Sequence, residues 1–134
     1  MGRRDDVLDA NEEFYRAFAR ADVEAMEDIW ATESYHVTVV HPGAAAISGR
    51  QGVIETWKAI FRDSSHVDIA CANAQAFLHG DMAIVICMEV VHGHGLAATN
   101  VFCRTDDGWR MIHHHAGPCH TPQRRNPEPR PVLH

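Results

Sequence analysis

The sequence contains no long apolar run, no paired-cysteine motif and no basic stripe, and each absence excludes a class of protein. No apolar stretch approaches the roughly 20 residues of a membrane span, so no membrane partner is expected. The four cysteines are widely separated and form no CxxC pair, which excludes a zinc ribbon or a thioredoxin-type motif. The net charge is −6 and Lys and Arg do not cluster with aromatic residues, so nucleic acid is not an expected partner.

The first ten residues, MGRRDDVLDA, also lack the apolar segment of a secretory signal. We therefore expect a cytoplasmic location. In a reducing compartment, the three cysteines that fall in strand patterns, Cys71, Cys87 and Cys103, are expected to act as small buried hydrophobic residues.

The length of 134 residues indicates one domain with a single core. The periodic patterns occupy residues 1–117. Five of the six prolines lie in the fourteen residues that follow Gly117. Residues 118–134 are therefore predicted to be a Pro-rich tail, extended or disordered.

Helical periodicity predicts three helices in the first half of the chain. Asp5 or Asp6 is expected to cap the first and Asp22 the second. Ser48 to Gln51 reads as a capping box at the start of the third. Between the second and third helices, residues 35–41 alternate as a strand, with Val37, Val39 and His41 on one face. The three apolar helix faces comprise Val7, Leu8, Phe14, Tyr15 and Phe18, then Val23, Met26, Ile29 and Trp30, then Val53, Trp57, Ile60 and Phe61.

From residue 66 the period changes to two, which predicts strands at 66–78, 82–92, 96–104 and 109–116. The breaks between them contain Gly with His or Asp, as in hairpin turns. Helices that cover one side of an antiparallel sheet make an α+β domain.

Glu89 is the one polar residue in the strand MAIVICMEVV. An unpaired buried carboxylate costs several kcal/mol, so Glu89 is expected to be paired, protonated or facing a pocket; the alternative is a rim residue that reaches water. Three-residue loops at 93–95 and 106–108 would place Glu89 opposite Thr99, and Thr99 opposite His115. A shift of one residue would instead place Asn100 opposite His113.

Three consecutive histidines follow Trp109 inside the last predicted strand, which excludes a purification tag. Alternation places His113 and His115 on the face of Trp109, and His114 on the opposite face as a structural or exposed residue. His113 and His115 with His92 or His94 could hold a metal, but the spacing has no specificity. We predict no metal and no cofactor, and keep a metal-dependent enzyme as an alternative.

His41 ends the first predicted strand, and Pro42 holds it extended. Its partners in the alternation are apolar, which places it on the inner face. A histidine at the rim of an apolar cavity can take or give a proton near neutral pH. The alternative is a strand-end histidine in solvent.

The segments FYRAFARADVEAMEDIWA, VTVVHPG, SGRQGVIETWKAIF and DDGWRMIHHHAGP, in this order, resemble the nuclear transport factor 2-like superfamily, within it the SnoaL-like and ketosteroid-isomerase-like branch. The resemblance covers residues from about 5 to 117. The closing segment is also similar to the association domain of calcium/calmodulin-dependent kinase II.

The resemblance implies a cone-shaped fold with a curved sheet around the helices, a mostly apolar cavity, and a homodimer through the outer face of the sheet. His41 stands where ketosteroid isomerases carry their aspartate base. Phe14, one place before Tyr15, stands where they carry a hydrogen-bonding tyrosine, and a phenyl ring cannot take that role. The steroid-isomerase mechanism is therefore not expected to carry over unchanged.

Two functions remain open. One is an enzyme of the isomerase, dehydratase or cyclase type that acts on a small apolar or aromatic molecule. His41 would be its base, His115 or His113 the acid, and Glu89 the partner of the imidazole, while Thr99 or Asn100 binds a substrate oxygen and Tyr15 and Trp57 line the cavity. The other is a non-catalytic dimeric binding or association module.

Overall fold

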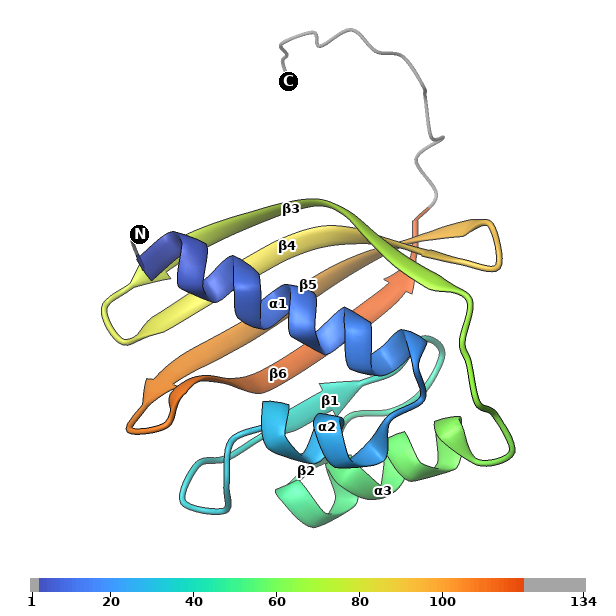
Figure 1. Cartoon of the computed structure of the whole chain (residues 1–134), viewed down its shortest axis with the longest axis horizontal. Helices are drawn as coiled ribbons and strands as arrows, with labels where there is room; N and C mark the ends of the chain where they lie inside the picture. Colours follow the sequence, from blue (N-terminus) through green and yellow to red (C-terminus); the bar gives the residue numbers. More distant parts are fainter. Residues whose placement is uncertain (1–2, 120–134) are drawn as a thin grey trace, which may run out of the picture.

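The computed structural model describes residues 3–119, which form three helices and a six-stranded sheet (Figure 1). The helices are α1 (Arg3–Ala19), α2 (Val23–Ile29) and α3 (Arg50–Phe61). The strands are β1 (Thr38–Val40), β2 (Ile47–Ser48), β3 (Ile69–His79), β4 (Met82–Val91), β5 (His94–Thr105) and β6 (Gly108–Pro118). The predicted α+β architecture, with helices on one face of a curved and mostly antiparallel sheet, is confirmed.

The strand order in the sheet is β2-β1-β6-β5-β4-β3. β1 pairs parallel with β6, and every other neighbouring pair is antiparallel. The strand predicted at residues 35–41 is shorter in the structure, because β1 covers only Thr38–Val40, and β2 was not predicted. β6 reaches Pro118, one residue into the predicted tail, and residues 120–134 of that tail lie outside the described residues.

The helix starts follow the sequence signals only in part. Asp22 caps α2 as predicted, because its Oδ1 accepts from the backbone N–H of Ala25 at 3.0 Å. The capping box predicted at Ser48 is wrong. Ser48 ends β2, and Gly49 is the N-cap of α3 with φ at 94° and no side-chain cap, a conformation that suits glycine because it has no Cβ. Asp5 and Asp6 lie in the first turn of α1 and not before it.

The hairpin between β4 and β5 is one residue shorter than expected. Its loop is His92 and Gly93, both with positive φ, and Val91 pairs with His94. Positive φ at both loop residues is typical of a tight two-residue hairpin turn. The shorter loop makes the predicted pairing of Glu89 with Thr99 wrong: Glu89 pairs with Leu96.

A β-bulge in β6 decides which histidines face inward. Phe102 pairs with Met111 but Val101 pairs with His113, so Ile112 is an extra residue. Each extra residue reverses the alternation of side chains along a strand. Trp109 and Met111 face the helices before the bulge, and His114 does so after it.

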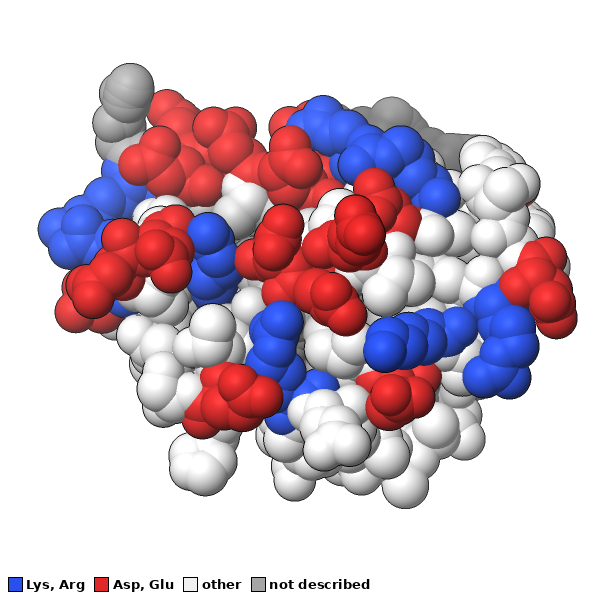
Figure 2. All heavy atoms as spheres, turned by 60° about the horizontal axis from the view of Figure 1, so that its bottom comes forward, with Lys and Arg blue, Asp and Glu red and all other residues white. Residues whose placement is uncertain are grey.

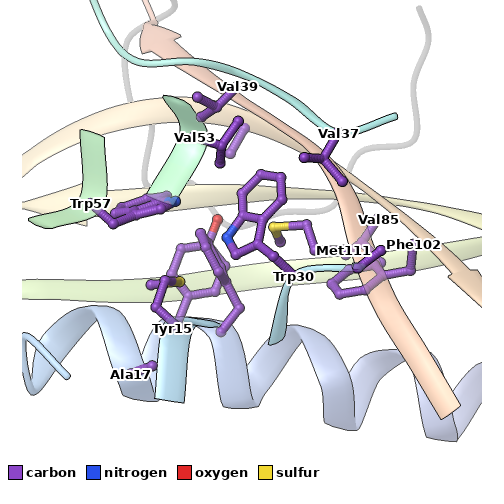
Figure 3. Close-up of a cluster of buried hydrophobic side chains, with 14 of the residues drawn as sticks. Tyr15, Ala17, Trp30, Val37, Val39, Val53, Trp57, Val85, Phe102 and Met111 are labelled. Atoms are coloured by element: carbon purple, nitrogen blue, oxygen red, sulfur yellow. The ribbon is translucent and has the colours of Figure 1, made fainter. Parts of the chain in front are cut away.

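The core lies between the inner face of the sheet and the helices. Figure 3 shows Trp30 and Trp57 above Tyr15 in this layer, with Phe102, Met111 and the valines of β1 and β4 around them. α1 packs along the inner face of the sheet (Figure 1), and Val39 of β1 lies in the core layer between them (Figure 3).

Charge is spread over the surface without a basic stripe on the side seen in Figure 2, where acidic side chains gather and Lys and Arg stand between them. None of the helices formed by residues 3–119 has the length and apolar character needed to cross a membrane.

Candidate functional site

The structure brings five of the predicted site residues to the inner face of the sheet and leaves three on the outer face. The inner residues are Tyr15, His41, Trp57, Glu89 and Asn100. The outer residues are Thr99, His113 and His115.

The predicted orientation of the last-strand histidines is therefore wrong. Thr99 does pair with His115, as expected, but on the outer face, where Val101 pairs with His113. His115 is exposed, and Nδ1 of His113 lies 2.6 Å from the Thr38 hydroxyl of β1. His114, expected to be structural or exposed on the opposite face, is buried in the core at 1% exposure.

Glu89 is paired inside the core and does not reach water. Its side chain is 2% exposed, and its Oε2 accepts a hydrogen bond of 2.7 Å from the Tyr15 hydroxyl. Burial raises the pKa of Glu89, which the Tyr15 bond only partly offsets. Burial and the neighbouring Glu89 also raise the pKa of Tyr15, so its hydroxyl stays protonated and acts as the hydrogen-bond donor.

Asn100 connects the polar groups of the interior. It has no exposed surface, and its Nδ2 donates to Asn11 Oδ1 at 2.8 Å and to the Tyr15 oxygen at 3.1 Å. Because both donors are used there, its Oδ1 points the other way, toward Nδ1 of His114 at 2.6 Å. The amide orientation is thus fixed by three partners.

The bond to Asn100 Oδ1 fixes the tautomer of His114. An amide oxygen only accepts, so Nδ1 of His114 carries the proton and Nε2 is left as a base. Nε2 lies 3.7 Å from Glu89 Oε2, the distance of a salt bridge. Burial, however, lowers the pKa of His114 to about 3, so the imidazole is neutral and the pair is not an ion pair near neutral pH.

His41 lies at the rim of this cluster with its ring edge against Trp57, centroids 4.8 Å apart, and 6.3 Å from the ring of His114. Its Nε2 is 2.9 Å from the Thr56 hydroxyl, which itself donates to the Val53 carbonyl at 2.6 Å. Thr56 must then accept from His41, so Nε2 is protonated and Nδ1 is free to take a proton. Burial lowers the pKa of His41.

Two buried donors are left without a partner. The indole Nε1–H groups of Trp30 and Trp57 have no hydrogen-bond partner among residues 3–119. In the view of Figure 3, each indole nitrogen is on the side of its ring that faces the other tryptophan, and the Tyr15 side chain ends between them. An unpaired buried N–H costs about 1–3 kcal/mol, which an acceptor oxygen would recover.

Hollows open elsewhere among residues 3–119. One of about 320 Å³ lies between the end of α2 and the β5–β6 turn, where Trp30, Arg50 and Asp107 line it. A second of about 270 Å³ lies between α1, α2 and Trp109, and a third of about 310 Å³ lies on the outer face of the sheet. The large apolar cavity predicted around His41 is not among them and stays a prediction.

Within residues 3–119, no three side chains of His, Cys, Asp or Glu are placed to hold a metal ion together. The metal-dependent alternative had depended on His113 and His115. Both lie on the outer face, and the ring of His114 points to the inner one.

Asn11, the inward face of His114 and the hydrogen bonds of Cys71 and Cys87 were not predicted. Asn11 lies four residues before Tyr15, one helical turn away, so a polar residue in the apolar stripe of α1 was a usable signal. His114 carried no such signal, because the bulge at Ile112 alone turns it inward.

Comparisons with known proteins agree with this fold. The sequence profile of the SnoaL-like domain matches residues 7–119. A candidate dehydratase of the NTF2-like family from Streptomyces avermitilis is 32% identical, with a TM-score of 0.81 over 87% of this chain and 95% of that one. A candidate calcium/calmodulin-dependent protein kinase type II association domain from Thiobacillus denitrificans is 32% identical, with a TM-score of 0.74 over 82% and 92%.

A curated relative, F-box protein SKIP8 of Arabidopsis thaliana, is 28% identical over 112 residues. The matched segment is 82% of this chain but only 48% of that protein, so this chain spans about half the length of its relative. The profile match covers most of the described residues and coincides with the α+β domain. The chain therefore belongs to the SnoaL-like domain family.

Proposed function

We propose that this chain is an enzyme that moves a proton on a small organic molecule, in a reaction of the dehydratase or isomerase type. The observation that carries the proposal is the buried cluster of Tyr15, Glu89, Asn100 and His114 with His41 at its rim. Groups with opposite pKa shifts in one site are typical of acid–base catalysis. The 32% identity to a candidate dehydratase favours a dehydration.

His41 is the proposed base. Its Nε2–H is held by Thr56, so Nδ1 is the nitrogen that accepts the proton. Its pKa is lowered by burial, which keeps the imidazole neutral at physiological pH and ready to act. Trp57 fixes the ring from the side.

Glu89 is the proposed acid, because its raised pKa favours the protonated form that can donate to a leaving oxygen. Tyr15 holds one carboxyl oxygen at 2.7 Å. The place expected for His115 is taken by His114, whose bare Nε2 lies 3.7 Å from the same oxygen and stays neutral beside it. Asn100 positions His114 and contacts no reacting atom.

The unpaired indole donors of Trp30 and Trp57 suit an acceptor oxygen such as a carbonyl. Aromatic rings border the cluster, since Phe14 lies 5.0 Å from the ring of His114 and 5.6 Å from Trp57. We therefore propose a small apolar or aromatic substrate that carries a carbonyl group.

Substitution of His41 by glutamine is expected to slow proton transfer by about 10²–10⁴-fold. The measurement is proton NMR in D₂O of exchange at the carbon next to the carbonyl, with a panel of aromatic and terpenoid ketones and their β-hydroxy derivatives. His115→Gln, a histidine on the outer face, is the matched control and should keep the wild-type rate. The proposed enzymatic function is excluded if the wild-type protein gives no faster exchange than buffer alone, or if His41→Gln gives the same exchange rate as wild type. The non-catalytic binding or association module would then remain.

We also propose that two copies of the chain pair through the outer face of the sheet. Phe77 is 46% exposed there, and Ile86 and Val90 are also exposed, in an apolar surface of β3 and β4. Exposed apolar patches of this kind are typical of protein interfaces. The cytoplasmic location expected from the sequence stays a proposal.

A further inference from the structure

Asn11 is a buried polar residue without a role in the proposed reaction. It is 2% exposed and lies on α1, one helical turn before Tyr15. Its Oδ1 accepts from Nδ2 of Asn100 at 2.8 Å, and its own Nδ2 donates to Sγ of Cys71 at 3.7 Å. Because both ends of the Asn11 amide have a partner, its orientation is fixed and can direct that of the neighbouring amide.

The orientation of the Asn100 amide decides which ring nitrogen of His114 carries the proton. Its Oδ1 faces the ring and accepts from Nδ1–H at 2.6 Å, which leaves Nε2 bare. If Nδ2 faced the ring instead, it would donate to Nδ1, and the ring proton would have to be on Nε2. The two ends of an amide have nearly the same shape, so packing alone does not choose between these orientations.

Two acceptors on α1 select the observed orientation of Asn100. One is the Tyr15 oxygen, 3.1 Å from Nδ2 of Asn100. A hydroxyl can also donate, so Tyr15 could serve the reversed amide by giving up its bond to Glu89. The amide oxygen of Asn11 can only accept, and it is the closer of the two at 2.8 Å. Asn11 is therefore the more selective partner.

The tautomer of His114 in turn affects the proton on Glu89. Nε2 of His114 lies 3.7 Å from Oε2 of Glu89. A bare Nε2 has no hydrogen to donate, so it gives no support to the ionised carboxylate. An Nε2–H would donate to the carboxylate and lower the pKa of Glu89, against the rise that burial causes. Glu89 would then lose the proton that an acid must carry.

We propose that Asn11 is a positioning residue, whose Oδ1 keeps the amide of Asn100 turned so that His114 presents a bare nitrogen to Glu89. The inference rests on the proposed function, in which Glu89 is the acid. Asn11 contacts no reacting atom, because Asn100 lies between it and His114. Helix α1 thereby sets the tautomer of a ring on β6.

The experiment compares Asn11→Leu with Asn11→Asp in the full chain labelled with ¹⁵N. The shifts of the two ring nitrogens of His114 at neutral pH give the ratio of Nδ1–H to Nε2–H tautomer. Leucine and aspartate have nearly the size of asparagine, but only aspartate keeps an oxygen that accepts from Asn100, in either of its protonation states.

In Asn11→Leu, one N–H of Asn100 is left buried without an acceptor unless the amide turns. The ratio of Nδ1–H to Nε2–H tautomer is therefore expected to fall by at least about fivefold, the low end of the effect of a buried donor without a partner. Asn11→Asp is expected to keep the wild-type ratio. If the leucine variant does not fold, Asn11→Ala takes its place with the same expected fall, because alanine has the highest helix propensity.

A ring that stays as fully protonated at Nδ1 in Asn11→Leu as in wild type would overturn the proposal. Equal changes in Asn11→Leu and Asn11→Asp would also overturn it, because packing and not the acceptor oxygen would then set the tautomer. The spectra require no substrate. A wild-type protein that catalyses no exchange would therefore contradict the proposed function alone, and the dependence of the His114 tautomer on Asn11 would be decided separately.

Discussion

Substitution of Asn100 by leucine lowers the free energy of unfolding by about 4 kcal/mol. Leucine has a similar size but no polar atoms. The change removes the bonds to Asn11 at 2.8 Å, to Tyr15 at 3.1 Å and to His114 at 2.6 Å. All three partners are buried, so none of them can turn to water, and each group that loses its partner costs about 1–3 kcal/mol. Denaturant unfolding followed by circular dichroism measures the loss.

The matched control is Thr99→Val, one residue earlier on β5 but on the outer face. Its effect should stay within about 0.5 kcal/mol, as for substitutions away from buried networks. A loss below about 1 kcal/mol for Asn100→Leu would show that the buried polar cluster does not hold the fold, and the assignment of Asn100 as its connecting residue would fail.

Acid destabilises the wild-type protein more than a His114→Gln variant, by about 2 kcal/mol between pH 6.5 and pH 4.5. Burial lowers the pKa of His114 from 6.5 to about 3 in the folded state. Between these two values the unfolded chain binds more protons, so stability rises with pH in that window and is lost as the pH falls. The full slope of about 1.4 kcal/mol per pH unit applies only well below pH 6.5, where the unfolded imidazole is mostly protonated, so the two units together give about 2 kcal/mol.

Glu89 has the opposite effect on the pH dependence of stability. Its folded-state pKa is raised, so its contribution to stability falls as the pH rises above its ordinary value of 4.5. The contribution of Glu89 cancels when wild type is compared with His114→Gln, because both proteins keep Glu89. His115→Gln should reproduce the wild-type pH dependence, since its ring is exposed on the outer face. Equal slopes for wild type and His114→Gln would contradict the neutral, buried imidazole.

The fold was predictable because each helix and long strand carries its own periodic signal. Asp22, with Val23, Met26 and Trp30 behind it, was enough to place α2, and the turns at Gly80, Gly93 and Gly108 separated the four long strands. β2 was missed because two residues carry no periodicity.

The residue types of the candidate site were predictable from the sequence. The face of the sheet on which each side chain lies was less predictable. Glu89 and Asn100 are polar residues in apolar strands, and both are buried. The register of Glu89 failed because GHG at 93–95 and HG at 92–93 are equally good turns, and only tertiary packing selects the shorter one. No glycine or proline marks the bulge at Ile112, so the inward face of His114 could not be read from the sequence.

The resemblance predicted a base at His41, which stays a prediction, and Tyr15 was expected only to line a cavity. The hydroxyl of Tyr15, one residue after the position expected from the resemblance, reaches Glu89 because Phe14 and Tyr15 are both buried, with their rings 4.7 Å apart. The interior thus contains a tyrosine–carboxyl pair that neither the periodicity nor the family pattern had assigned.

The imidazole nitrogens of His114 provide the most direct measurement of the cluster. Two-bond ¹H–¹⁵N correlation spectra of the labelled protein, assigned by comparison with His114→Gln, give the tautomer and charge of this ring between about pH 5 and pH 8. The arrangement with Asn100 predicts a neutral ring throughout, protonated at Nδ1 and bare at Nε2. A ring that becomes doubly protonated near pH 6.5, or one that carries its proton on Nε2, would contradict it.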